Sequence, residues 1–164
     1  DRAAYDARRG QLVADCVADF RGAEYGVDIY KLEPPSTLVN VPDPDGKDAA
    51  AVQKLYDAMV RDLPGPWVLL SAGASAEDFL RSLVYAYRAG ASGYLCGRAI
   101  WKTAFDLFPD FEAIEAELIR TSKPYLDRIN ALTDKYALPW TKHAAFADGI
   151  TLDGGPDFTS TYEA

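Results

Sequence analysis

Three short apolar segments, residues 26–32, 67–71 and 92–96, are the features that most constrain the fold of this chain. Each has the length and the β-branched or aromatic composition of a buried strand, and each is followed by an amphipathic segment with helical spacing. The predicted helices cover residues 8–21, 48–61, 75–90, 100–108 and 111–136. A regular alternation of strands and helices predicts an α/β fold with a parallel sheet and right-handed crossovers.

Local signals place several of the helix ends. Ser75, with Asp78 three residues later, is typical of a helix N-cap, and Gly90 is typical of the end of the same helix. Pro124 lies inside the last helical segment and should kink or divide it.

The number of strands limits the architecture. Three strands are far fewer than the eight of a (β/α)8 barrel, which needs roughly 250 residues, whereas this chain has 164. The chain is therefore either a small, incomplete α/β unit or the later part of a larger barrel. In the second case the remaining strands belong to a segment absent from this sequence or to another chain, and the sheet has open edges prone to pairing.

Composition excludes some partners. The formal net charge of −8 argues against nucleic acid or an anionic membrane as the main partner, and no apolar run approaches the roughly 20 residues of a membrane span. Cys16 and Cys96 form no CxxC pair, so we expect two buried thiols in a reducing cytoplasm. Residues 144–164, rich in Gly, Asp and Thr, are expected to form a poorly structured tail after the domain of residues 1–143.

Lys31 is the one lysine within the strand-like segments. Strand alternation places Ile29, Lys31 and Glu33 on one face and Tyr30 and Leu32 on the other. Apolar neighbours would desolvate the amine and make it a nucleophile toward carbonyl groups, and Glu33 could orient it or carry protons. A structural Lys–Glu pair, or a lysine that reaches solvent at the strand end, explains the same pattern.

Two strand ends have the composition of an anion site. Ser71 and Gly73 follow the second strand just before a helix begins, and backbone amides at a helix start favour anions. Gly97 and Arg98 follow the third strand, where glycine allows close approach and arginine offers two donors. A plain capped turn and a surface salt bridge are the alternatives for these two segments.

The other polar groups carry less information. The single histidine, His143, has no partner pattern and is expected on the surface. Asp43, Asp45 and Asp48 fall in a proline-rich loop without the spacing of a calcium site, so we predict no metal. The aromatic series is interpreted as core or interface: Tyr85, Tyr87, Trp101, Phe105 and Phe108.

Several of these segments together resemble a known family. Residues 26–34, 70–75 and 89–101 are similar, in order and spacing, to the C-terminal half of the tagatose 1,6-bisphosphate aldolases, a family that includes the sulfofructosephosphate aldolases. Pro139-Trp140-Thr141 is similar to the tagatose-bisphosphate branch, and the resemblance covers about residues 8–143. It implies that the chain is about strands six to eight of a (β/α)8 TIM barrel. Strands one to five, which carry the family's further acid/base carboxylate, have no counterpart here.

The resemblance also assigns roles to single residues. It implies a cofactor-independent class I aldolase that cleaves a ketohexose bisphosphate, or 6-sulfofructose 1-phosphate, through a lysine Schiff base. The catalytic residues would be Lys31 and Glu33, and the phosphate or sulfonate ligands would be Ser71, Gly73, Gly97 and Arg98. A non-catalytic half-barrel that pairs with another chain, a sugar-phosphate sensor, and a deoxyribose-phosphate-type aldolase remain open, as does an oligomer.

Overall fold

The computed structural model describes residues 2–149, and its elements follow the predicted order. The strands are β1 (Tyr30–Leu32), β2 (Trp67–Leu70) and β3 (Gly93–Leu95). The α-helices are α1 (Arg2–Asp19), α2 (Ala49–Met59), α3 (Ala76–Arg88), α4 (Arg98–Phe105), α5 (Phe111–Glu117) and α6 (Lys123–Tyr136). Short 3-10 helices cover Ala23–Tyr25, Trp140–Lys142 and Ala144–Phe146. None of the helices in this part of the chain is long and apolar enough to cross a membrane.

The three strands form a parallel sheet in the order β1-β2-β3, which confirms the predicted α/β sheet. Lys31 is level with Val68, and Val68 with Gly93, so these three residues share one row. Strand β1 is shorter than the predicted 26–32. Its pairing begins where the Tyr30 amide donates to the Pro66 carbonyl, and the proline-rich turn before Trp67 gives the earlier residues no partner strand.

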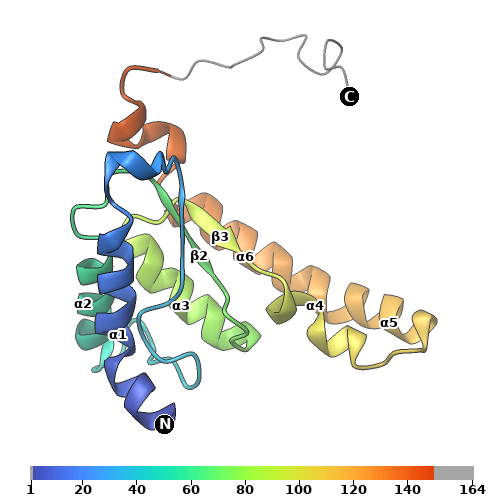
Figure 1. The fold of residues 1–164 in the computed structure, drawn as a ribbon. Coiled ribbons are helices and arrows are strands. Elements are labelled where there is room, and N and C mark those ends of the chain that lie inside the picture. Colours follow the sequence, from blue (N-terminus) through green and yellow to red (C-terminus); the bar gives the residue numbers. More distant parts are fainter. Residues whose placement is uncertain (1, 150–164) are drawn as a thin grey trace.

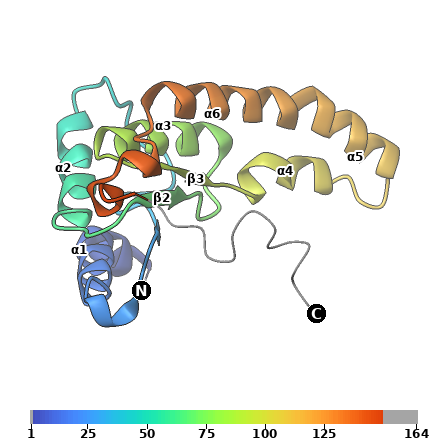
Figure 2. The same cartoon turned by 90° about the horizontal axis from the view of Figure 1, so that it is seen from above.

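One face of the sheet is covered by helices and holds the core. Tyr30, Leu32, Trp67 and Leu69 are all buried on this face. They join one cluster with residues of α2, α3 and α6, among them Tyr56, Met59, Phe79, Leu83 and Ile129. Figure 2 shows these helices gathered together on one side of the strands.

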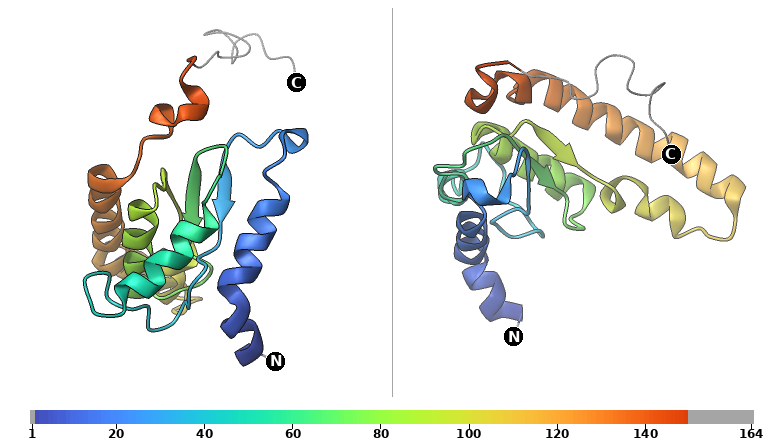
Figure 3. Two further views of the ribbon diagram at one scale, coloured as in Figure 1. Left: turned by 90° about the vertical axis from the view of Figure 1, so that its left-hand side faces the viewer. Right: turned by 45° about the horizontal axis from the view of Figure 1, so that its top comes forward.

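The opposite face of the sheet is largely open. Ile29 and Leu95, which point to this side, are 49% and 47% exposed, and Lys31 is exposed as well. Helix α1 lies beside β1, with the strands between it and α3 (Figure 3). It contacts α2 and places Val17 in the core. The sheet therefore has a complete hydrophobic layer on one side only.

The predicted helix ends at α3 are confirmed. The Ser75 hydroxyl accepts a hydrogen bond from the Asp78 amide, and Gly90 adopts a left-handed conformation with a φ of 84° just after the helix. The long C-terminal helical segment is divided as Pro124 predicts, although a π-helical stretch, Leu118–Ser122, joins α5 to α6.

Helices α4 and α5 extend away from the sheet as an arm alongside α6 (Figure 1). Of the aromatic series, Tyr85 and Tyr87 are buried in the core, whereas Trp101, Phe105 and Phe108 of the arm are 40–66% exposed. The predicted tail lies mostly outside the described residues, which end at residue 149 and include the 3-10 helix Ala144–Phe146.

Two predicted burials are wrong for this chain. Cys16 is exposed on α1, because the surface of α1 around it faces the open side of the sheet, while Cys96 is partly buried. Lys31 is exposed rather than desolvated, because the described residues place no layer over its face of the sheet.

Candidate active site

The predicted site residues lie at or near the carboxyl ends of the three strands. Because the strands are parallel, Glu33, Ser71 and Cys96, which follow their last residues, all lie at the same edge. This carboxyl edge is where parallel α/β folds bind ligands. The helices α3 and α4 begin a few residues later, at Ala76 and Arg98.

Lys31 projects from the middle of β1 onto the open face. The burial pattern of the strand, with Tyr30 and Leu32 buried and Lys31 exposed, confirms the predicted alternation. Lys31 and Glu33 line a shallow cleft of about 300 Å³ that is closed on the other side by α1. The amine is therefore accessible to a small molecule that approaches the open face.

Glu33 has a partner that the sequence analysis did not identify. Arg9, on α1, donates from Nη2 to Oε2 of Glu33 at 2.9 Å and from Nε to the Pro34 carbonyl at 2.9 Å. The sequence does contain a signal for this buried arginine. Arg9 lies at helical spacing from Val13 and Val17 and so falls on the apolar stripe of α1. A charged residue on a buried stripe needs a partner.

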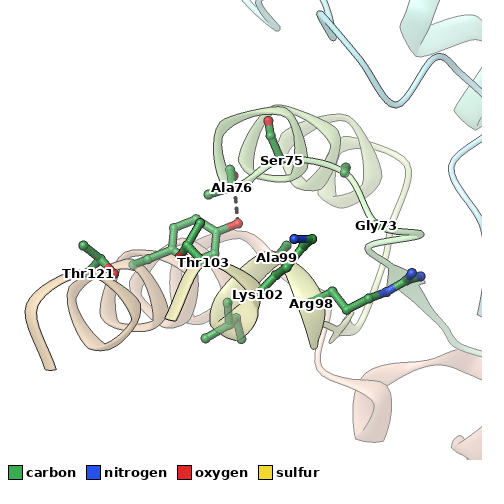
Figure 4. A pocket seen from close by; sticks show the side chains of 11 residues that line it. Gly73, Ser75, Ala76, Arg98, Ala99, Lys102, Thr103 and Thr121 are labelled. Carbon is green, nitrogen blue, oxygen red and sulfur yellow. Dashed lines mark hydrogen bonds between the residues drawn. The ribbon is translucent and has the colours of Figure 1, made fainter. Parts of the chain in front are cut away.

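Arg98 meets Gly73 across the two loops. A side-chain carbon placed on Gly73 would lie 3.5 Å from Nη2 of Arg98, so the guanidinium rests against the glycine. Figure 4 shows Arg98 extending toward the Gly73 side of a cavity of about 480 Å³, away from Thr121. Gly73 and the residue before it, Ala72, both have positive φ angles, 82° and 48°. A left-handed conformation is unfavourable for alanine, so this turn stores strain.

The electrostatics of Arg98 favour an anion. It is the first residue of α4, where the helix dipole places partial positive charge and disfavours a cation. Among the residues whose side chains the structure describes, its guanidinium has no hydrogen-bond or ion-pair partner, and it rests against Gly73. An exposed arginine at a helix start, facing a glycine turn, has donors available for a phosphate or sulfonate.

The floor of the Arg98 cavity is held by one strong bond. The Tyr125 hydroxyl donates to the Ala76 carbonyl at 2.7 Å and so links α6 to the first turn of α3. Burial raises the pKa of the Tyr125 phenol, which keeps it a neutral donor. This bond ties two elements of the cavity wall together, and Lys102, Thr103 and Thr121 line the same cavity.

Ser71 and Gly97 lie at the base of the two loops. Ser71 is buried, its amide donates to the Leu95 carbonyl and its carbonyl accepts from the Ala74 amide. Its hydroxyl faces the Cys96 thiol, whose pKa is raised by burial and partly lowered again by this hydroxyl. Gly97 is the N-cap of α4, with its carbonyl accepting from the Ile100 and Trp101 amides. The backbone hydrogen bonds of Ser71 and Gly97 therefore stabilise the two loops that carry Gly73 and Arg98.

A second cavity connects the two halves of the site. Glu33, Arg9 and Arg98 line the same space of about 390 Å³ together with Ala72. Lys31 and Glu33 share one cleft and Glu33 and Arg98 another, so Glu33 joins the lysine to the anion loops.

Other polar residues have structural roles. Asp45 forms an ion pair with Arg88 at 2.7 Å, and Nδ1 of His143 accepts a hydrogen bond from the Ala145 amide. No group of three or more His, Cys, Asp or Glu side chains within the described ranges is arranged to hold a metal ion.

Comparison with known proteins identifies the family. A family model described as DeoC/LacD family aldolase matches residues 1–103, which include all six predicted site residues. This chain belongs to that family. Tagatose 1,6-diphosphate aldolase 2 of Streptococcus mutans serotype c is 35% identical over 141 residues, which cover 79% of this chain and 42% of that relative. Tagatose 1,6-diphosphate aldolase of Listeria monocytogenes serotype 4a is 32% identical over 144 residues, or 80% of this chain and 42% of the relative.

The alignments cover most of this chain but less than half of each relative. A third relative, tagatose 1,6-diphosphate aldolase 2 of Streptococcus pyogenes serotype M3, is 35% identical over 82% of this chain but only 43% of its own length. The DeoC/LacD chain described here therefore spans less than half the length of these curated relatives.

Proposed function

We propose that this chain carries the Schiff-base half of a class I aldolase that cleaves a ketohexose bisphosphate such as tagatose 1,6-bisphosphate. The observation that carries the proposal is the position of Lys31, an accessible amine on the open face of a parallel sheet. It shares a cleft with the Glu33 carboxylate, and Glu33 shares a second cavity with the Arg98 guanidinium. The relatives named as tagatose 1,6-diphosphate aldolases support the substrate class.

The chemistry follows from these groups. The Lys31 amine attacks the C2 ketone, and loss of water gives an iminium that accepts the electron pair of the breaking C3–C4 bond. The aldehyde leaves, the remaining enamine is protonated at C3, and water hydrolyses the iminium to release dihydroxyacetone phosphate and regenerate the amine. Glu33 carries protons in the carbinolamine steps. A second acid/base group, which the resemblance places on the remaining strands of a barrel, would take the C4 hydroxyl proton as the aldehyde leaves.

Arg98 and the Gly73 turn would hold a terminal phosphate of the substrate. The guanidinium offers two donors in a fork, and the start of α4 adds the positive end of a helix dipole. The absence of a side chain at Gly73 lets the guanidinium lie against the backbone of this turn, and Ser71 and Gly97 support the two loops. A sulfonate has the same shape and charge pattern, so 6-sulfofructose 1-phosphate is the alternative substrate.

We propose further that β1, β2 and β3 correspond to strands six to eight of a (β/α)8 barrel. The open face with exposed Ile29 and Leu95 supports this, because the inside of a barrel is filled by side chains from all its strands. The missing strands would come from a segment outside this sequence or from another chain. The same open face supports the second candidate, a non-catalytic half-barrel that binds sugar phosphate and pairs with another chain. The free thiols suit a cytoplasmic location.

Borohydride trapping tests the proposal. The protein, as its gene encodes it, is incubated with dihydroxyacetone phosphate and sodium borohydride, and the reduced adduct is mapped by mass spectrometry. We expect one adduct per chain, on Lys31, and a loss of aldol cleavage of roughly 10⁴-fold or more in Lys31→Arg, which keeps the positive charge but not the nucleophile.

Lys54→Arg provides the matched control, because Lys54 is exposed on α2 and lies outside the site clefts. Labelling of Lys31 together with normal cleavage by the control supports the aldolase. An adduct on a different lysine, or none, contradicts it. Retained phosphate binding without any adduct would instead favour the non-catalytic half-barrel.

A further inference from the structure

Arg9 is a charged side chain buried next to the proposed nucleophile. It is 6% exposed, and the other polar side chains buried in the described ranges are all serines. Burying a guanidinium is expensive unless its donors are satisfied. A helix in a small domain would retain such a residue only if its bonds hold something in place.

The bonds of Arg9 converge on the residues that follow β1. Nη2 donates to one oxygen of Glu33, and Nε donates to the Pro34 carbonyl, both at 2.9 Å. Pro34 and Pro35 are fully buried, so the carbonyl is a fixed point, and the planar fork of arginine then fixes the carboxylate relative to it. The Tyr5 ring lies 5.8 Å from the guanidinium carbon and supports its other side.

This arrangement leaves half of Glu33 free. Oε2 is bonded to Arg9, whereas Oε1 has no hydrogen bond to the described part of the chain. The Glu33 side chain is 50% exposed, whereas the Arg9 side chain behind it is buried. Because Glu33 lines both the Lys31 cleft and the second cavity, which Arg98 also lines, its free oxygen is available to a substrate that spans them.

We propose that Arg9 is a positioning residue of the aldolase site, which clamps Oε2 of Glu33 so that Oε1 faces the substrate bound at Lys31. This inference rests on the proposed function and adds to it a residue from the helix before the nucleophile strand. Arg9 touches no reacting atom and acts only through Glu33. Small displacements of a catalytic group lower the rate by up to about 100-fold. We therefore expect the loss of Arg9 to lower kcat and to leave KM nearly unchanged.

A double-mutant cycle tests this role. Arg9→Ala, Glu33→Gln and the double variant are compared in the complete protein for kcat, KM and borohydride trapping. We expect Arg9→Ala to lower kcat roughly 10- to 100-fold with KM changed less than about threefold. In the Glu33→Gln background the same change should lower kcat by less than about twofold, because the group that Arg9 positions is already lost.

Two further variants separate positioning from folding. Arg9→Lys keeps the charge but places all its donors on one nitrogen atom, so it cannot hold Glu33 and Pro34 in the fork geometry. It should remain folded and still lose most of the kcat of the unmodified protein. Arg8→Ala, one residue earlier and exposed on α1, should leave both constants unchanged. Millimolar guanidinium should restore part of the kcat of Arg9→Ala but not of the double variant.

The outcomes are distinguishable. Equal losses from Arg9→Ala with and without Glu33 would mean that Arg9 only stabilises the fold and would overturn the inference, as would full activity of Arg9→Lys. In either case trapping at Lys31 would persist and the proposed function would stand. An unmodified protein that gives no Lys31 adduct overturns the proposed function and the role of Arg9 together.

Discussion

The two faces of the sheet differ in what they do for the molecule. On the covered face, Tyr30, Trp67 and Leu69 are at most 6% exposed and pack against three helices. On the open face, Ile29 and Leu95 are about half exposed, and the one lysine of the strands stands between them. Folding energy is therefore concentrated on one side, and the groups suited to chemistry lie on the other.

The same contrast appears between two arginines. Arg9 is buried, and its Nη2 and Nε atoms donate to Glu33 and Pro34. Arg98 is exposed and is the first residue of α4, and it forms no ion pair with the side chains that the structure describes. A buried arginine bonded to its own chain holds protein groups in place, whereas an exposed arginine at a positive helix end is suited to an incoming anion.

The largest effect should come from the covered face. Leu69→Ala removes a side chain that is 0% exposed in the middle of β2 and should lower the free energy of unfolding by about 2–5 kcal/mol. Leu95→Ala makes the same change at a residue that is 47% exposed on the open face, and the loss should stay below about 0.5 kcal/mol. Urea unfolding followed by circular dichroism measures both.

A comparable loss at Leu95 would mean that the open face is covered in solution. Repeating the measurement over a tenfold range of protein concentration then shows whether a second chain covers it, because an intermolecular contact makes the midpoint concentration-dependent.

The two cysteines should differ in reactivity by about tenfold or more. Cys16 is exposed and lines the same cleft as Lys31, whereas Cys96 packs against the core behind Ser71. Burial raises the pKa of the Cys96 thiol, so at pH 8 a smaller fraction is the reactive thiolate. Iodoacetamide labelling of Cys16→Ser and Cys96→Ser, each with one thiol left, gives the two rates.

Both variants should react at the same rate in urea, which removes the effect of burial. A native Cys96 that reacts as fast as Cys16 would contradict the described packing at the end of β3. A slow native Cys16 would instead show that the open side of β1 is covered by another segment or chain.

Much of the fold could be predicted from the sequence because its signals are local. Alternation assigned Tyr30 and Lys31 to opposite faces, and cap chemistry placed Ser75 and Gly90 at the two ends of α3. These features depend on neighbours within a few residues, which the sequence shows directly.

The remaining features depend on residues distant in the chain. The exposure of Lys31 and Cys16 depends on which layers cover the sheet, and the length of β1 is set by the turn before Trp67. Arg9 meets Glu33 across 24 positions, and Arg98 meets Gly73 across two loops. Composition and periodicity identify such residues as candidates but do not pair them.

The smallest effect should come from Arg98. Because a cation at a helix start opposes the helix dipole, Arg98→Ala should raise the free energy of unfolding by about 0.3–1 kcal/mol in buffer without phosphate. Arg61→Ala, which removes an exposed arginine outside α4, should change it by less than about 0.5 kcal/mol. Inorganic phosphate should stabilise the unmodified protein and Arg61→Ala, but not Arg98→Ala, since a ligand stabilises only the form that binds it. Destabilisation by Arg98→Ala would show that the guanidinium stabilises the fold, and an unchanged response to phosphate would place the anion site elsewhere.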